Sequence, residues 1–240
     1  MDPIETNASA AIAERKSGRG AFQSGGTPPG AFGQFLFKII FRTLYLIIHL
    51  LLRGIVFVKR EGPPIPKGAV ILAPNHCSLI DPPVIQMADW RHISFMMTDG
   101  FYNPPLTRWF FQAFRAIPVK EGRGNRDAIR AAVEALNRGW TVCIFPEGGI
   151  AKDGKLQKFH PGITVLAEAA NASVVPIAVI GTFEAFPRHA KFPKMWRKVI
   201  VRHGAPIPPP EASGDEASRK ELLRTYADKI RDAVAQLQMQ

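Results

Sequence analysis

Six short runs rich in β-branched and aromatic residues alternate with helical patterns along the chain, and this alternation constrains the fold most strongly. The runs are IVFV, AVILA, ISFMM, TVCIF, VVPIAVI and KVIVRH, each bounded by glycine, proline or charged residues. Alternating strands and helices are typical of an α/β domain in which helices flank a mostly parallel sheet. We therefore expect residues 55–210 to form a single domain of this class.

Three segments between and after these runs have the pattern of helices. In residues 125–139 an apolar face is followed by Gly139, at the position just past a helix end where glycine is favoured. Residues 162–172 read as another helix, and a proline-rich linker precedes the last one. Residues 211–240 predict a C-terminal helix that docks through one side, formed by Leu222, Leu223, Tyr226, Ile230, Val234 and Leu237.

The N-terminal region predicts a tail and a membrane-associated helix. Residues 1–30 are small and polar, as in a flexible tail, and contain no recognisable secretory signal. Residues 31–54 are apolar, but the longest stretch without a formal charge, Thr43–Leu52, is shorter than the roughly 20 residues of a membrane span. On a helix, the polar residues fall on one narrow stripe, which is typical of a helix lying in the bilayer interface.

Two other interpretations of residues 31–54 stay open. The segment is also compatible with a helix packed on the protein's own core, or with a tilted span whose cations reach the interface. Gly54 is a point at which the segment can divide into two helices. The formal net charge of +11 favours an anionic partner, such as a bilayer, an acidic carrier protein or nucleic acid. No recognition-helix or aromatic–basic sheet motif supports nucleic acid.

The stretch PNHCSLIDPP places a histidine and an aspartate directly after a predicted strand. That strand ends at Pro74, so Asn75 and His76 lie at the carboxyl edge of the sheet, where α/β folds place their sites. Asp81 is five residues after His76, outside the spacing of helical neighbours, so an irregular turn is needed to join them. Such a pair can orient the imidazole as a general base. The alternative is a purely structural turn.

The sequence around this pair favours direct transfer without a covalent intermediate. Cys77 adjoins His76, and Ser78 has no nucleophile-elbow pattern around it. We expect His76 to deprotonate a substrate hydroxyl that then attacks an activated acyl group, although a Cys77-dependent thioesterase or transacylase stays open. The only other cysteine is Cys143, and the spacing matches no disulfide or metal motif, as expected in a reducing compartment. The second candidate turn, FPEGG, also follows a predicted strand.

Together these motifs resemble those of the 1-acylglycerol-3-phosphate (lysophosphatidic acid) acyltransferase family of glycerolipid acyltransferases. NHCSLID fits the N-H-x-x-x-x-D motif of that family, and FPEG fits its third motif. RAIPVKEGRGNRDAIRAAVEALNRG lies where the second motif belongs, and VVPIAVIGT fits the fourth. The four motifs follow the family's order between about Ile55 and Pro206.

The resemblance implies transfer of a fatty acyl chain from acyl-CoA or acyl-ACP, with no other cofactor. The acceptor is a lysolipid hydroxyl, in the first place that of 1-acyl-sn-glycerol-3-phosphate, which gives phosphatidic acid. The alternatives are another lysolipid acceptor, or a non-catalytic lipid-binding protein with the same fold. The resemblance further implies monotopic attachment to anionic lipids at the cytoplasmic face of the inner (plasma) membrane.

The resemblance also assigns site residues. It implies His76 as base and Asp81 as its orienting partner. For substrate binding it implies Asn75, Lys120, Arg123, Phe145, Pro146, Glu147 and Gly148.

Two positions depart from the family's pattern. The second motif commonly carries an arginine where this chain has Lys120-Glu121, with Arg123 nearby. The third commonly reads FPEGTRS, so that Ile150 replaces an arginine, with Lys152 and Lys155 as candidate substitutes. Because arginine binds phosphate in a bidentate way that lysine does not, the acceptor's phosphate monoester stays open.

Overall fold

The computed structural model describes residues 56–120 except Trp90, residues 125–211 except Met195, residues 216–240, and the two isolated residues Thr43 and Ile47. The predicted tail and, apart from those two residues, the predicted membrane segment lie outside the described residues. In the described part of the chain, none of the helices combines the length and the apolar character needed to cross a membrane.

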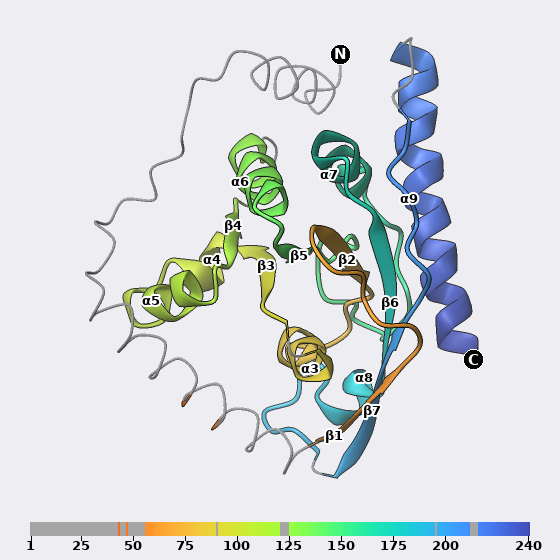
Figure 1. The fold of residues 1–240 in the computed structure, drawn as a ribbon. Coiled ribbons are helices and arrows are strands. Elements are labelled where there is room, and N and C mark those ends of the chain that lie inside the picture. Colours follow the sequence, from red (N-terminus) through yellow and green to blue (C-terminus); the bar gives the residue numbers. More distant parts are fainter. Residues whose placement is uncertain are drawn as a thin grey trace.

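A seven-stranded sheet forms the centre of the described domain, in the order β1-β7-β6-β2-β5-β3-β4 (Figure 1). All neighbouring strands are parallel except β6 and β7, so the predicted mostly parallel sheet is confirmed. The strands are β1 Val56–Glu61, β2 Val70–Pro74, β3 Ile93–Thr98, β4 Ile117–Val119, β5 Thr141–Cys143, β6 Val174–Ile180 and β7 Arg197–His203.

Helices cover both faces of this sheet (Figure 1). The described helices are α3 Asp81–Ala88, α4 Asp99–Tyr102, α5 Pro105–Ala113, α6 Arg126–Asn137, α7 Gly162–Ala170, α8 Thr182–Ala185 and α9 Glu216–Met239. One core cluster joins the sheet to α6, α7 and α9, and a second joins it to α3 and α8. Along β2, Ile71 and Ala73 belong to the first cluster, while Val70 and Leu72 belong to the second, as the alternation of a strand requires.

The predicted helices are present as α6, α7 and α9. Gly139 follows the end of α6 with a φ of +78°, in the left-handed region that glycine adopts without strain. The helix α9 packs on β6 and α7 and buries Leu223, Tyr226, Ile230, Val234 and Leu237, while Leu222 is half-buried. The docking helix is therefore confirmed, and it closes one face of the sheet.

Candidate active site

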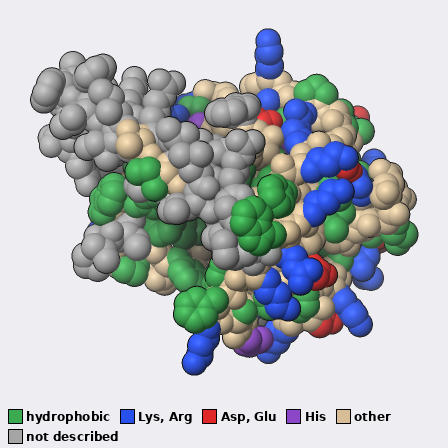
Figure 2. All heavy atoms as spheres, turned by 90° about the horizontal axis from the view of Figure 1, so that it is seen from below, with side chains coloured by type: hydrophobic (Ala, Val, Ile, Leu, Met, Phe, Trp, Pro, Cys, Tyr) green, Lys and Arg blue, Asp and Glu red, His purple; other side chains and the backbone are tan. Residues whose placement is uncertain are grey.

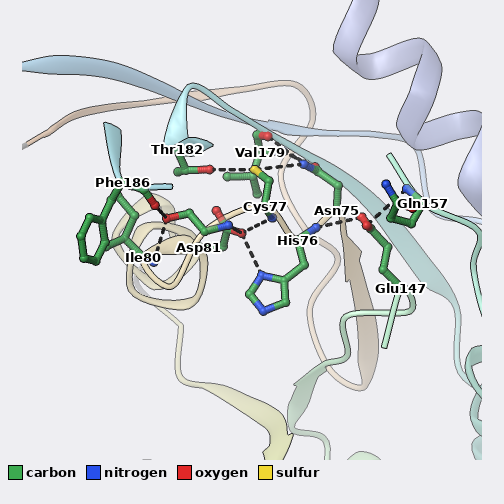
Figure 3. A network of polar contacts seen from close by, with 11 residues as sticks. Asn75, His76, Cys77, Ile80, Asp81, Glu147, Gln157, Val179, Thr182 and Phe186 are labelled. Atoms are coloured by element: carbon green, nitrogen blue, oxygen red, sulfur yellow. Dashed lines mark hydrogen bonds and ion pairs between the residues drawn. The ribbon is translucent and has the colours of Figure 1, made fainter. Parts of the chain in front are cut away.

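Two loops carry the candidate active site, and both leave the same edge of the sheet. The strands β2 and β5 are parallel neighbours, with Leu72 paired to Cys143. The loop after β2 carries His76, and the loop after β5 carries Phe145 to Gly148. Carboxyl ends of neighbouring parallel strands meet, so the two motifs, which are far apart in the sequence, lie side by side (Figure 3).

His76 and Asp81 form the predicted pair. Nδ1 of His76 lies 2.8 Å from Oδ2 of Asp81. The carboxylate is fully buried, whereas 15% of the histidine side chain is exposed. An ionised carboxylate can only accept a hydrogen bond, so Nδ1 donates and Nε2 keeps a free lone pair. In Figure 3 the second ring nitrogen of His76 points away from Asp81. The pair therefore presents a histidine nitrogen able to take a proton.

The irregular turn expected between His76 and Asp81 is present. Oδ2 of Asp81 also accepts hydrogen bonds from the backbone N–H groups of Cys77 and Ser78, at 2.8 Å each. Asp81 begins α3 and is followed by Pro82 and Pro83, which have no N–H groups to leave unsatisfied at the helix start. One buried oxygen thus folds the chain into a tight turn and orients the imidazole at the same time.

Glu147 connects the second loop to the first. Its Oε1 accepts a hydrogen bond of 2.9 Å from the backbone N–H of His76, and its Oε2 accepts one of 3.3 Å from that of Gln157. On its other side, the carbonyl of His76 accepts a hydrogen bond of 2.8 Å from the backbone N–H of Ala151. Burial raises the pKa of Glu147 to about 6, against the effect of these hydrogen bonds. Glu147 therefore positions the histidine, and its predicted contact with the acceptor stays a prediction.

The amide of Asn75 is bound to strand β6. Its Oδ1 accepts from the N–H of Val179 at 2.7 Å, and its Nδ2 donates to the carbonyl of Val179 at 2.9 Å. In the same region, Oγ1 of Thr182 lies 3.2 Å from Sγ of Cys77. Residues of the fourth motif thus hold the first motif in place. The substrate contact expected of Asn75 stays a prediction.

The aromatic and glycine positions of the FPEG motif lie against two different histidines. The ring of Phe145 stacks on the imidazole of His76, with centroids 3.9 Å apart. Gly148 has a φ of +73°, and a Cβ there would lie 3.0 Å from Cδ2 of His160. The backbone N–H of His160 donates to the carbonyl of Pro146 at 2.8 Å. The sequence did not single out His160, because no local pattern brings it to this motif.

The predicted cationic residues are only partly described. Lys120 is exposed and directly follows β4, which ends at the same edge of the sheet as the site. Lys152 and Lys155 are exposed on the loop that continues from the FPEG motif. Arg123 lies outside the described residues. No group of three or more His, Cys, Asp or Glu side chains placed to hold a metal ion is found among the described residues.

Cys77 lacks the properties of a nucleophile. Only 4% of the residue is exposed. Burial, together with the negative charge of Asp81, raises the pKa of its thiol to about 12. Since the thiolate is the reactive form, this thiol is inert near neutral pH. The geometry therefore favours the histidine pair over a cysteine-dependent reaction.

A family model described as Acyltransferase matches residues 56–180, which contain both loops of the site. The chain belongs to this acyltransferase family. The resemblance to 1-acylglycerol-3-phosphate acyltransferases is confirmed by the curated relatives as well. The acyltransferase is 28% identical over 129 residues to the chloroplastic 1-acyl-sn-glycerol-3-phosphate acyltransferase LPAT1 of Arabidopsis thaliana, an alignment that spans 53% of this chain and 36% of that protein.

Other relatives cover more of the chain or carry another name. A probable 1-acyl-sn-glycerol-3-phosphate acyltransferase of Mycoplasma pneumoniae is 25% identical over 222 residues, covering 82% of this chain and 80% of that protein. A lyso-ornithine lipid O-acyltransferase of Pseudomonas aeruginosa is 26% identical over 124 residues, covering 51% of this chain and 47% of that protein. The crystal structure of the acyltransferase PlsC from Thermotoga maritima has the same fold, with a TM-score of 0.59 and 22% identity. The match covers 93% of this chain and 87% of that chain.

Proposed function

We propose that this acyltransferase is a membrane-associated enzyme that transfers a fatty acyl chain from acyl-CoA or acyl-ACP to a lysolipid hydroxyl. The observation that carries the proposal is the pair formed by His76 and Asp81 at the carboxyl edge of the sheet, 2.8 Å apart and oriented by a buried carboxylate. The family match supports the class of reaction.

The geometry supports a direct transfer in which His76 handles the proton. Nε2 of His76 takes the proton of the acceptor hydroxyl as the oxygen attacks the thioester carbonyl, and Asp81 stabilises the imidazolium that forms. The tetrahedral intermediate then collapses, the carbon–sulfur bond breaks, and the imidazolium returns its proton to the leaving thiolate. No enzyme thiol or hydroxyl is acylated, in agreement with the buried state and raised pKa of Cys77.

The acceptor that we propose first is 1-acyl-sn-glycerol-3-phosphate, which the names of the relatives from Arabidopsis thaliana and Mycoplasma pneumoniae support. A phosphate monoester needs cationic partners when it leaves water. Lys120, Lys152 and Lys155 are exposed around the candidate site and are available for this role, as is Arg123 by its place in the sequence. A lysolipid without this phosphate is the second candidate, because a lyso-ornithine lipid acyltransferase is also a relative.

An assay of the purified full-length protein tests the proposal. Lysophosphatidic acid, other lysophospholipids and lyso-ornithine lipid are each offered with acyl-CoA and with acyl-ACP, and acylated product is measured by mass spectrometry. We expect product with at least one pair of substrates, and lysophosphatidic acid as the best acceptor. A correctly folded protein that acylates none of these acceptors would contradict the proposal and favour a lipid-binding role.

The variant Arg123→Ala tests whether Arg123 binds the phosphate of the acceptor. If arginine binds a phosphate monoester, the Michaelis constant for lysophosphatidic acid rises by a factor that corresponds to about 1.5–3 kcal/mol. Lys229→Ala, on the exposed side of α9, is the matched control for the loss of one positive charge. Unchanged kinetics in the Arg123 variant would transfer the phosphate contact to Lys120, Lys152 or Lys155.

A further inference from the structure

An exposed loop between α8 and β7 lies beside the candidate active site. Its base is closed by a hydrogen bond of 2.7 Å from the N–H of Lys194 to the carbonyl of Ala185. Ser78, two residues after the candidate base, forms an antiparallel bridge with Pro187, and its hydroxyl donates to the carbonyl of Phe186. The loop is therefore attached to the turn that carries His76.

Large aromatic side chains are exposed on this loop and on the neighbouring strand. Phe192 is 82% exposed, Trp196 is 67% exposed, and Phe57 on β1 is 53% exposed. The rings of Phe57 and Trp196 lie against each other, with centroids 5.7 Å apart. Phe57 is also in register with Lys198 at the start of β7. Three exposed aromatic rings on adjacent segments are costly in water unless another apolar phase receives them.

The same segment is strongly cationic. From residue 186 to residue 198 the sequence contains no aspartate or glutamate. Its five cationic side chains are all exposed, namely Arg188, Lys191, Lys194, Arg197 and Lys198. Figure 2, which views the molecule from below, shows lysine and arginine side chains intermixed with hydrophobic ones on that face.

We propose that Phe57 and residues 188–198 other than Met195, here called the aromatic–basic patch, form a membrane contact of the α/β domain itself that binds an anionic lipid surface. Tryptophan and phenylalanine enter the headgroup region, where their rings are stable, while the surrounding lysines and arginines attract anionic headgroups. A protein partner would need complementary acids and a defined shape, whereas a bilayer accepts this irregular mixture of rings and cations. The patch consists of other residues than the predicted interfacial helix at residues 31–54.

This contact would place the candidate site directly over its substrate. Ser78 joins the His76 turn to Phe186 and Pro187, which directly precede the patch in the same loop, so binding of the patch to a bilayer holds that turn close to the headgroups. An acceptor lysolipid then reaches the histidine without leaving the lipid phase entirely. This purpose rests on the proposed function, but membrane binding by the patch can be measured without any turnover.

Depth-dependent quenching in the full-length protein tests the proposal. The native cysteines Cys77 and Cys143 are buried, so a fluorophore attached to Phe192→Cys reports on the loop alone. Vesicles contain equal parts of phosphatidylcholine and phosphatidylglycerol, with a quencher on the lipid chains. We expect quenching of this label but not of one on Lys229→Cys, an exposed position of α9, which packs on the opposite face of the sheet from α8.

A charge variant gives the second measurement. Lys191→Gln with Lys194→Gln should weaken binding to these vesicles by roughly 10- to 30-fold, from about 1 kcal/mol for each lysine near the surface. The control, Lys220→Gln with Lys229→Gln, removes the same charge from α9 and should change binding little. Turnover of a lysolipid dispersed in detergent should stay normal in both variants.

The outcomes are distinguishable. An unquenched label at position 192 on bound protein overturns the proposal. A label that is already shielded from water without vesicles overturns it as well, since residues 31–54 or a second copy of the chain would then cover the patch. Equal effects of the two charge variants also overturn it, because attraction would depend on net charge alone. If the label is quenched but no lysolipid is acylated, the patch stands and the proposed function fails.

Discussion

Replacement of Asp81 by alanine should destabilise the protein strongly, because one buried oxygen holds the whole catalytic turn. Oδ2 accepts three hydrogen bonds of 2.8 Å, from Nδ1 of His76 and from the N–H groups of Cys77 and Ser78. A hydrogen bond to a charged group contributes about 1.5–3 kcal/mol. His76 is partly exposed, so water can replace its bond, but Cys77 and Ser78 are buried. The two backbone bonds alone then amount to about 3–6 kcal/mol.

Denaturant unfolding of Asp81→Ala, His76→Ala and the double variant measures this quantity, with the detergent held constant. We expect His76→Ala to keep most of the stability, because it removes only the partly exposed donor. Asp81→Ala should lower the free energy of unfolding by about 3–6 kcal/mol both in the wild type and in His76→Ala, since the backbone hydrogen bonds of Asp81 do not depend on the imidazole. A loss below about 1 kcal/mol would refute the argument that Asp81 organises the turn.

Three further changes test other parts of the structure. Glu147→Gln keeps one acceptor oxygen and should reduce turnover by a factor that corresponds to about 1.5–3 kcal/mol. Because burial raises the pKa of Glu147 to about 6, protonation of this carboxylate should add to the fall of wild-type activity below pH 6. This contribution should be lost in the variant, in which only protonation of the base remains, whereas an unchanged pH profile would dismiss a role of Glu147. Burial and the charge of Arg60 lower the pKa of His203 to about 4, so the folded state binds fewer protons than the unfolded state between pH 6.5 and 4. The contribution of His203 to the free energy of unfolding is then fully present above pH 6.5 and decreases towards pH 4 by up to about 3 kcal/mol. This dependence should be absent in His203→Asn. Ile230→Ala, in the fully buried face of α9, should cost about 2–5 kcal/mol of unfolding free energy, whereas the neighbouring Lys229→Ala should cost little.

Periodicity and β-branched runs predicted the sheet and the helices α6, α7 and α9 on one of its faces, but not α3 and α8 on the other face. The runs at β2, β5 and β6 lie at the centre of the sheet, where both faces are buried and nearly every residue is apolar. The strand β4 was missed because Ile117–Val119 is too short to show a pattern, and α4 and α8 were missed for the same reason. The direction of β7, which is antiparallel to β6 and parallel to β1, was also unpredictable, since the sequence of a strand carries no local record of its neighbours.

The candidate site was predicted where a strand end determined the position of a side chain. The end of β2 places His76, and the turn before Pro82 brings Asp81 to it, as the sequence indicated. The roles of Asn75 and Glu147 depend on backbone groups of distant segments, which no local spacing reveals. His160 reaches the FPEG motif only through the fold. Polar side chains that satisfy backbone atoms are therefore hard to distinguish from substrate ligands by sequence alone.

Turnover of His76→Ala, compared with Cys77→Ala, tests the central claim most directly. Both variants are purified in the same detergent, their folding is verified by circular dichroism, and acylation of lysophosphatidic acid is measured. The account predicts that loss of the base lowers turnover by roughly 10²–10⁴-fold, while Cys77→Ala stays near the wild-type rate. A folded His76→Ala protein with near-normal turnover, or a Cys77→Ala protein that is inactive although folded, would contradict it.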